Sequence, residues 1–516
     1  MKKTVLRPPR QGEQDDLTIM PKKTTVLCII DGLGINESEH GNAVSAADMV
    51  NLNRAMQKYP TATLVASGPE VGLLPGDAGN SEVGHNAIGS GQFIKQGLAL
   101  LNERFESGEI FESDTWMRLA ENAKKTKLNI IILLSDGRVH SDIRHLHKIV
   151  SRCEKDGIPV SIHALADGRD VTTQSVITYI SQTKGKISTL AGRGRAFMDR
   201  YESNPQMLVN GFELTVNGVG TKTTDIEQSI TAEYSKNHKM TDETLTEFVL
   251  DSGGLIKNGD SVLLLNYRGD RAVQTCKMFE EGKYLTPEQF SKIDKCLFVG
   301  ILEYDTELKI PTRYLCPPPV INNTLTQYLC AHNVRQYTVT ESVKFGHLTY
   351  FFNGNRAKKV CEKLETWQEI KSDVLPSFDI APKMKAREIT AKTIQAIQSN
   401  KYDFIKLNLS NPDMVGHSAN FDATVIACQV VDECLGEIIA MCEQTNTNLI
   451  ITSDHGNAEE MLDQNGKPKS AHTNSDVPMI IIGSPKIKNG GLTNIAATIC
   501  KLLALEPSPH FNPPLL

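Results

Sequence analysis

The sequence predicts an α/β protein whose main sheets are parallel and carry helices on both faces. Short apolar runs rich in Val, Ile and Leu recur along the 516 residues, and each is too short for a typical helix. Such continuous apolar runs are typical of strands buried on both faces. Amphipathic stretches alternate with them, for example residues 419–443, where apolar residues recur at helical spacing. This alternation favours parallel strands joined by helices, as in a doubly wound sheet.

Six apolar runs define the expected strands, and each closes on a polar cluster. In chain order they are VLCIIDG, IIILLSDG, SIHALADGRD, SVLLLNYRGDR, FIKLNLSNPD and LIITSDHG. Ligands of parallel sheets bind beyond the carboxyl ends of the strands. Because Asp, Arg, His and Asn residues stand at those ends, we expect the chemistry there.

Two stretches are expected domain boundaries. One follows the glycine-rich segment 84–97, and the other is the run of three prolines after Cys316, which cannot continue a helix or a central strand. We therefore expect residues 96–318 to be inserted into a discontinuous domain of residues 24–95 plus 319–516. Residues 1–23 are expected to form a flexible N-terminal extension.

Composition narrows the class of protein. Lys and Arg number 55 against 61 Asp and Glu, and this mildly acidic chain without a basic run is a poor candidate for binding nucleic acid or an anionic membrane. The 11 cysteines are scattered in apolar runs without a CxxC pair, which is typical of a reducing compartment. The N-terminal segment lacks the apolar core of a signal peptide, and no run of about 18 apolar residues occurs. These features predict a cytoplasmic, soluble protein.

Candidate metal ligands follow several of the expected strands. Asp413 and His417 are four residues apart, so on a turn entering a helix both can face one ion. Asp454 and His455 stand where a buried strand becomes a loop, and both can face a shared cavity. Each motif alone also fits a helix cap or loop with an unrelated histidine. The full set, which contains no thiolate, is Asp31, Asp413, His417, Asp454, His455 and His472.

This set of oxygen and nitrogen donors suits divalent ions such as manganese, zinc, cobalt or magnesium. Six ligands exceed what one four-coordinate ion needs. Two metals about 3.5 to 4 Å apart are therefore expected, an arrangement that clamps the attacking and leaving oxygens in phosphoryl transfer.

Ser81 is the candidate nucleophile. It stands in GNSEVGH between glycines, where close backbone approach and a helix N-terminus suit an incoming phosphate. Contact with a divalent cation would stabilise the alkoxide that a serine cannot otherwise form at neutral pH. The alternative is that Ser81 or Asn80 merely caps a helix.

Basic residues follow several expected strands of the inserted segment. These are His140, Arg169, Arg193, Arg195, Arg200, Arg268 and Arg271. Because the guanidinium group binds phosphate and carboxylate bidentately, they predict an anion receptor, with ordinary solvated arginines as the alternative. Asp170 can exchange a proton with a substrate hydroxyl, or it can be a structural carboxylate paired with arginine. Lys344, in KFGH, can reach a phosphate or be an ordinary surface lysine.

Nine motifs in this order closely resemble the cofactor-independent phosphoglycerate mutases of the alkaline phosphatase superfamily: GNSEVGH, LLSDGRVHS, ADGRD, FMDR, NYRGDR, KFGH, NPDMVGH, SDHGNAE and AHT. The resemblance runs from about Thr24 to the C-terminus. It implies an alkaline-phosphatase-like domain that holds two Mn²⁺ ions and an inserted phosphotransferase domain that binds substrate. It also implies an isomerase that interconverts 3-phosphoglycerate and 2-phosphoglycerate in glycolysis and gluconeogenesis without 2,3-bisphosphoglycerate.

The resemblance also implies residue roles. One metal would be held by Asp413, His417 and His472, and the other by Asp31, Ser81, Asp454 and His455. Ser81 would become phosphoserine, Asp170 would shuttle a proton, and Lys344 would lie near the transferred phosphoryl group. The substrate would be bound by His140, Arg169, Asp170, Arg193, Arg200, Arg268, Arg271 and Lys344.

The chain departs from the family pattern at four places, one of which is the segment upstream of Thr24, which has no counterpart there. Arg138 stands where the family usually has glycine, and no tryptophan follows MDR. The spacing before MDR differs, so either Arg193 or Arg195 matches the family's substrate arginine, and counting back from Arg200 favours Arg193. A phosphopentomutase, a metal-dependent phosphatase, or a sugar-phosphate binding protein without turnover remain alternatives. A monomer with a small-molecule substrate and no nucleic-acid or membrane partner is expected.

Overall fold

The computed structural model describes residues 23–199, 204–237, 239–305, 308–319, 321–375, 377–463, 466–484 and 486–516. Arg200 and all of the expected N-terminal extension except Lys23 lie outside these residues. The chain divides into two compact units. Unit 1 contains the residues up to Ile94 and those after Pro319, and unit 2 is Lys95–Pro319.

Unit 1 is built on an eight-stranded mixed sheet. Its strand order is β12 (Glu365–Ile370), β11 (Gln336–Glu341), β13 (Phe404–Leu409), β1 (Thr25–Ile30), β14 (Asn448–Thr452), β15 (Val477–Ile482), β2 (Thr61–Val65) and β16 (Gly490–Gly491). The five strands from β12 to β14 are parallel, whereas β15 is antiparallel to both of its neighbours. Every residue of β1, β13 and β14 is buried, as continuous apolar runs predict.

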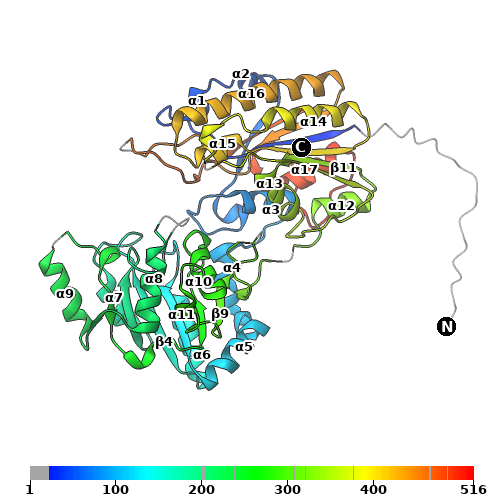
Figure 1. Ribbon diagram of the computed structural model, residues 1–516. Coiled ribbons are helices and arrows are strands. Elements are labelled where there is room, and N and C mark those ends of the chain that lie inside the picture. Colours follow the sequence, from blue (N-terminus) through cyan, green and yellow to red (C-terminus); the bar gives the residue numbers. More distant parts are fainter. Residues whose placement is uncertain are drawn as a thin grey trace, which may run out of the picture. The chain divides into compact units, whose positions relative to one another are not determined.

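Helices cover both faces of this sheet (Figure 1). Alternate strand residues divide between two hydrophobic clusters, because successive side chains of a strand point to opposite faces. One cluster joins the sheet to α2 (Val50–Lys58), α14 (Ala386–Gln398) and α16 (Phe421–Gln444). The other joins it to α3 (Ser81–Ser90), α12 (Leu325–Ala331) and α17 (Ile495–Leu502).

The helix expected over residues 419–443 is α16, displaced by a residue or two. Ala419 has a positive φ of 57°, which no α-helix accommodates, and the Asn420 side chain then accepts a hydrogen bond from the Ala423 amide as the N-cap. The helix therefore begins at Phe421.

Unit 2 contains a second eight-stranded sheet. Its order is β10 (Tyr314–Cys316), β9 (Leu297–Leu302), β8 (Ser261–Leu264), β3 (Leu128–Leu133), β4 (Val160–Ala166), β5 (Ile187–Gly192), β7 (Phe248–Val249) and β6 (Thr221–Lys222). The strands from β10 to β5 are parallel. The predicted α/β class with mostly parallel sheets is thus confirmed in both units.

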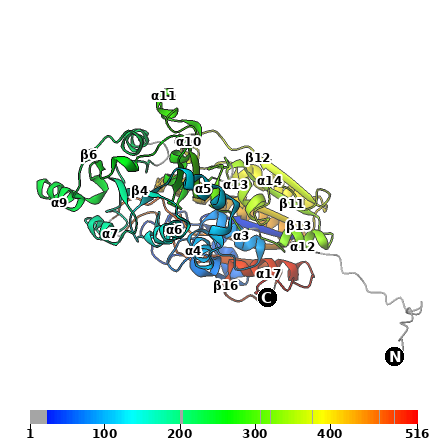
Figure 2. The ribbon, with the colours of Figure 1, turned by 90° about the horizontal axis from the view of Figure 1, so that it is seen from below.

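Helices also lie on both faces of the second sheet, and Figure 2 shows α6 and α7 on one side of β4 and α10 on the other. One hydrophobic cluster includes α4 (Gly97–Ser107), α5 (Asp114–Lys125), α6 (Ile143–Asp156), α7 (Val176–Gln182) and α9 (Ile226–Lys236). The opposite cluster includes α8 (Gln206–Phe212) and α10 (Val273–Glu281). Among the described residues, no helix is long and apolar enough to cross a membrane.

Candidate functional site

Three buried aspartates lie at the carboxyl ends of the central strands of unit 1. Asp31 directly follows β1, which pairs in parallel with both β13 and β14. Asp413 follows β13 on the short helix α15 (Asn411–Gly416), and its amide donates to the Asp31 carbonyl at 3.1 Å. Asp454 follows β14, and each of these three residues is at most 1% exposed. Parallel pairing therefore gathers three carboxylates at one edge of the sheet.

Three histidines surround the Asp413 carboxylate. The Nε2 atoms of His417 and His472 each lie 3.3 Å from Asp413 Oδ1, and that of His455 lies 4.0 Å away. The Nδ1 atoms of His417 and His472 instead face the carbonyls of Ser470 and Gly79, at 2.8 and 3.0 Å. Such carbonyl contacts orient the ring, so that Nε2 points to the carboxylate. Asp413 and His417 therefore lie together, and that both face one ion stays a prediction.

A second group consists of Asp31, Asp454 and His85, whose ligand atoms lie within 4.8 Å of one another. His85 Nδ1 is 3.1 Å from Asp454 Oδ2, and the Asn408 amide donates to both Asp31 Oδ2 at 2.7 Å and His85 Nε2 at 3.2 Å. Asp454 Oδ2 is buried without a hydrogen bond among the described residues. A buried carboxylate oxygen left without a donor suits a cation.

Ser81 begins helix α3 and lies beside this carboxylate cluster. The Asn80 side chain caps the helix by accepting from the Val83 amide at 3.0 Å. The Ser81 hydroxyl is therefore free for other contacts, and its Oγ lies 3.0 Å from His455 Nε2 and 3.3 Å from Asp31 Oδ1. The helix-cap alternative therefore holds for Asn80, but it does not account for the contacts of the Ser81 hydroxyl.

Lys344 is the cation at the centre of the cluster. It lies on α13 (Ser342–Gly346), directly after β11, and is 3% exposed. Its ammonium donates to Ser81 Oγ at 2.6 Å, Asp413 Oδ2 at 2.7 Å and Asp31 Oδ1 at 2.9 Å. The surface-lysine alternative is therefore wrong.

Charge and burial shift the pKa values in this cluster strongly. Burial opposes ionisation of Asp31, but the Lys344 ammonium and the His455 imidazole together outweigh it and hold the pKa of that carboxyl far below its usual value. Burial likewise opposes protonation of His455, but Asp454, Asp31 and Asp413 raise the pKa of its imidazole to about 10. The buried carboxylates of this cluster thus strongly favour positively charged groups beside them.

The donor set fits divalent cations. It offers carboxylate oxygens, imidazole nitrogens and a serine oxygen, with no thiolate, and this mixture suits manganese, cobalt, zinc or magnesium. Seven predicted residues lie together: Asp31, Ser81, Asp413, His417, Asp454, His455 and His472.

A separate cluster lies at the carboxyl ends of the unit 2 strands. Arg193, which follows β5 and is 3% exposed, donates through Nη1 to Asp167 Oδ1 at 2.6 Å and also to Asp170 Oδ2. Ser135 donates to the other Asp167 oxygen at 2.7 Å. Asp167 therefore anchors Arg193, and Arg193 in turn holds Asp170.

His140 connects this cluster to the segment after β8. Its Nε2 lies 3.9 Å from Asp170 Oδ2, and its Nδ1 lies 3.8 Å from Asp270 Oδ1. Arg268 Nε is 3.3 Å from the same Asp270 oxygen, and Arg271 donates to the Met198 carbonyl at 2.6 Å. The strand ends of unit 2 thus bring together His140, Asp170, Arg193 and the Arg268–Arg271 turn.

Two predicted arginines lie outward from this cluster. The Arg169 side chain is 58% exposed and lies 3.4 Å from Glu243, and Arg195 pairs bidentately with Glu247 at 3.1 Å. Arg193 is therefore the arginine buried against Asp170, whereas Arg195 pairs with Glu247. Arg200 lies outside the described residues.

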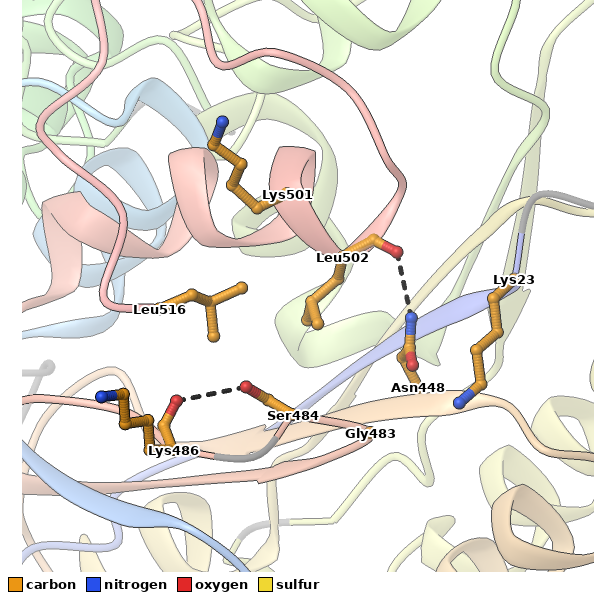
Figure 3. A pocket seen from close by; sticks show the side chains of 8 residues that line it. All are labelled: Lys23, Asn448, Gly483, Ser484, Lys486, Lys501, Leu502 and Leu516. Atoms are coloured by element: carbon orange, nitrogen blue, oxygen red, sulfur yellow. Dashed lines mark hydrogen bonds between the residues drawn. The ribbon is translucent and has the colours of Figure 1, made fainter. Parts of the chain in front are cut away.

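A pocket of about 420 Å³ lies elsewhere in unit 1 (Figure 3), near the amino ends of β1 and β14. Its lining residues are Lys23, Asn448, Gly483, Ser484, Lys486, Lys501, Leu502 and Leu516. No predicted site residue lines this pocket, because the candidate ligands stand at the opposite, carboxyl ends of the same strands.

Three residues of the unit 1 cluster were not among the site residues predicted from the sequence. His85 is one, although its spacing of four from Ser81 in the helix α3 could have indicated a shared face. Asn408 and Asn457 are the others, and Asn457 donates to Asp413 Oδ1 at 2.8 Å. Asn457 stands two residues after His455, but an asparagine in a loop carries no sequence signal of its own.

The chain is similar to known proteins over nearly its whole length. A model of the metalloenzyme superfamily matches residues 23–507. A probable 2,3-bisphosphoglycerate-independent phosphoglycerate mutase of Leptospira interrogans is 37% identical, over 96% of this chain and 97% of that protein. The 2,3-bisphosphoglycerate-independent phosphoglycerate mutase of Mesembryanthemum crystallinum is 36% identical, over 96% of each chain.

A solved structure shares the fold. Leishmania mexicana phosphoglycerate mutase, crystallised at low cobalt concentration, matches with a TM-score of 0.69 and 32% identity, over 96% of this chain and 98% of that one. The superfamily match implies divalent metal ions as cofactors. Since both relatives and this structure cover nearly the whole chain, the chain belongs to the 2,3-bisphosphoglycerate-independent phosphoglycerate mutases of the metalloenzyme superfamily.

Proposed function

We propose that this protein interconverts 3-phosphoglycerate and 2-phosphoglycerate through a phosphoserine at Ser81. The observation that carries the proposal is the position of the Ser81 hydroxyl, at a helix N-terminus and in contact with Lys344, His455 and Asp31. Pure binding of a sugar phosphate needs no such nucleophile. The names of the relatives give the substrate class.

We assign one metal to Asp413, His417 and His472, and the other to Asp31, Ser81, Asp454 and His455. Bound there, divalent cations would neutralise the buried carboxylates, favour the Ser81 alkoxide and stabilise charge on the phosphate oxygens. We propose Mn²⁺ as the physiological ion, and Co²⁺, Mg²⁺ and Zn²⁺ suit the same donors.

The protein side chains then have defined tasks in unit 1. Ser81 Oγ attacks the phosphorus of the substrate in line, and the bond from phosphorus to the glycerate oxygen breaks. The Lys344 ammonium, 2.6 Å from Ser81 Oγ, stabilises negative charge on that oxygen and on the phosphoryl group. The other glycerate oxygen next attacks the phosphoserine, and the bond between phosphorus and Ser81 Oγ breaks.

Unit 2 supplies the proton transfer and the anion contacts. Asp170 passes a proton between the two glycerate oxygens: the oxygen that loses phosphate receives it, and the oxygen that accepts phosphate loses it. Arg193 orients the Asp170 carboxylate, since it donates to it directly. We assign binding of the substrate carboxylate and phosphate to His140, Arg169, Arg193, Arg200, Arg268 and Arg271.

The cellular setting follows from this chemistry and composition. A phosphoglycerate mutase serves glycolysis and gluconeogenesis, and we propose that it acts as a monomer in the cytoplasm. The small-molecule substrate requires no nucleic-acid or membrane partner.

An assay after metal depletion tests the proposal. The protein is stripped with a chelator, supplied with Mn²⁺, and given 3-phosphoglycerate while the phosphorus species are followed by ³¹P NMR. The expected product is 2-phosphoglycerate, formed only after the ion is restored. Release of free phosphate as the main product would identify a phosphatase, and turnover of ribose 1-phosphate instead would identify a phosphopentomutase.

A further inference from the structure

Glu459 is a buried carboxylate close to the loops that carry the assigned metal ligands. Among the described residues, it forms no hydrogen bond or ion pair with those ligands. It stands in the loop after β14, and its side chain is 0% exposed. Within the described part of the chain, it forms no ion pair with Lys, Arg or His. Burying a carboxylate without a cation is costly unless hydrogen bonds compensate it.

Those hydrogen bonds come from three separate segments. Glu459 Oε2 accepts from the Gly34 amide at 3.0 Å and from the Asn457 amide at 2.8 Å, and Oε1 accepts from the Thr473 hydroxyl. Gly34 lies three residues after Asp31, Asn457 two after His455, and Thr473 one after His472. One carboxylate therefore connects the three segments that carry ligands of both proposed metals.

The surrounding backbone packs closely against the Glu459 carboxylate. A Cβ at Gly34 would lie 2.4 Å from Glu459 Cδ, and a Cβ at Gly456 would lie 2.5 Å from Glu459 Oε1. Both glycines allow the chain to pack closely around the Glu459 side chain. Gly456 also bridges to Thr473 through the backbone, where the Thr473 amide donates to the Gly456 carbonyl at 3.0 Å.

We propose that Glu459 is a positioning residue for metal binding, which fixes the spacing of the Asp31, His455 and His472 segments. This inference rests on the proposed metal-dependent function and deepens it. Groups that orient metal ligands from behind contribute about 10- to 100-fold to metal affinity. The effect of losing Glu459 should therefore appear in the affinity for the ion itself, measured without substrate.

Asp432 offers a matched control in the same unit. It is a buried carboxylate on α16 that accepts from the Asn51 and Leu52 amides at 3.0 and 2.8 Å, so it also connects separate segments. In the described part of the chain, its side chain forms hydrogen bonds only with Asn51 and Leu52, which belong to no segment with an assigned ligand. Its loss should lower stability without changing the spacing of the metal ligands.

Titration of the metal-free protein with Co²⁺, followed by visible absorption, tests the proposal. The proteins compared are the wild type, Glu459→Ala, Glu459→Gln, Thr473→Val and Asp432→Ala. We expect Glu459→Ala to weaken Co²⁺ binding by about 10- to 100-fold. Glu459→Gln and Thr473→Val should weaken it by a smaller factor, and Asp432→Ala should stay within about twofold of wild type.

Several results would overturn the proposal. Wild-type affinity for Co²⁺ in Glu459→Ala would contradict it. An equal loss of Co²⁺ affinity in Glu459→Ala and Asp432→Ala would also contradict it, because that loss would reflect lower stability in general. If Glu459→Ala does not fold, unchanged binding by both Glu459→Gln and Thr473→Val would contradict it. A wild-type protein that binds no Co²⁺ would overturn the proposed function as well, whereas normal wild-type binding with unaffected variants would overturn this inference alone.

Discussion

Lys406 is a charged side chain in the core of unit 1, in the middle of β13 and 1% exposed. Its Nζ lies 3.7 Å from the centre of the Phe352 ring and makes no hydrogen bond among the described residues. Burial lowers the pKa of this lysine to about 7, although Glu365 opposes the shift. A lysine at this place costs stability whenever it is protonated in the folded protein.

We expect Lys406→Met to raise the free energy of unfolding of unit 1 at pH 7 by about 3 kcal/mol. Lowering the pKa from 10.5 to about 7 corresponds to ~5 kcal/mol, and loss of the contact with Phe352 offsets ~1 to 2 kcal/mol of that gain. Because the pKa is about 7 in the folded protein and 10.5 in the unfolded chain, the unfolded chain binds more protons between these values. Wild-type stability should therefore rise with pH in this window, and the advantage of the variant should shrink toward pH 10.

Denaturant unfolding at pH 7, 8 and 9.5, read from peptides of unit 1 by hydrogen exchange, checks this prediction. A matched control is Leu407→Met, on the next residue of the same strand, which should show no such pH dependence. A Lys406→Met protein less stable than wild type at pH 7 would show that the contact with Phe352 outweighs the cost of burial.

The sequence predicted which single residues belong to the site better than it predicted which residues contact one another. Asp31, Asp413, His417, Asp454 and His455 were recognisable because they end buried strands or share a helical turn. The choice between Arg193 and Arg195 depended on which way the chain turns after β5, where Arg193 is buried and Arg195 pairs with Glu247. Likewise, nothing in the local sequence shows that Lys406 lies under Phe352, because that contact joins distant segments.

Helix α3 approaches the loop after β14 very closely, and this approach places the nucleophile. A Cβ at Gly84 would lie 2.5 Å from the Asp454 carbonyl oxygen. Gly84 is on the first turn of α3, which begins at Ser81. The helix can reach this position only because residue 84 has no side chain.

We expect Gly84→Ala to lower kcat/KM for 3-phosphoglycerate by about 10- to 100-fold, since displacements near 1 Å at an active site have effects of this size. The added methyl must push α3 away from the loop that carries Asp454 and His455. A coupled assay of purified protein measures the loss. Gly491→Ala is the control, because a Cβ there meets nothing closer than 3.6 Å. Unchanged kcat/KM in Gly84→Ala would contradict the close approach.

Among the elements, the six apolar runs predicted β1, β3, β4, β8, β13 and β14, because strands buried on both faces need such runs. Other strands of the two sheets, such as β9 and β15, were not among those predicted. Helix ends were harder to predict, since they depend on single residues such as Ala419 with its positive φ. The short antiparallel strand β7 and the two-residue strands β6 and β16 could not be predicted, because their hydrogen bonds come from strands distant in sequence.

The two units differ in how much they should depend on metal. Unit 1 contains the buried carboxylates of Asp31, Asp413 and Asp454, whereas the unit 2 cluster pairs Asp167 and Asp170 with Arg193. Because all assigned metal ligands lie in unit 1, loss of divalent cations would remove positive charge from its buried carboxylates, whereas Asp167 and Asp170 keep Arg193.

Chelation should therefore destabilise unit 1 selectively. At a metal concentration of about 100 times its Kd, binding contributes ~2.7 kcal/mol to the stability of the unit that binds it. Peptide-resolved hydrogen exchange with and without chelator measures this contribution in each unit separately. We expect faster exchange in β1, β13 and β14 and no change in β3, β4 and β5. Equally faster exchange in both units, or no change in either, would contradict metal binding in unit 1.

In the proposed mechanism, Ser81 carries the phosphoryl group during turnover. Rapid quenching of the Mn²⁺-loaded protein with ³²P-labelled 3-phosphoglycerate, followed by peptide mapping, tests it directly. We expect label on the peptide that contains Ser81, and neither label nor mutase turnover in a folded Ser81→Ala protein. Near-normal formation of 2-phosphoglycerate by Ser81→Ala would contradict it.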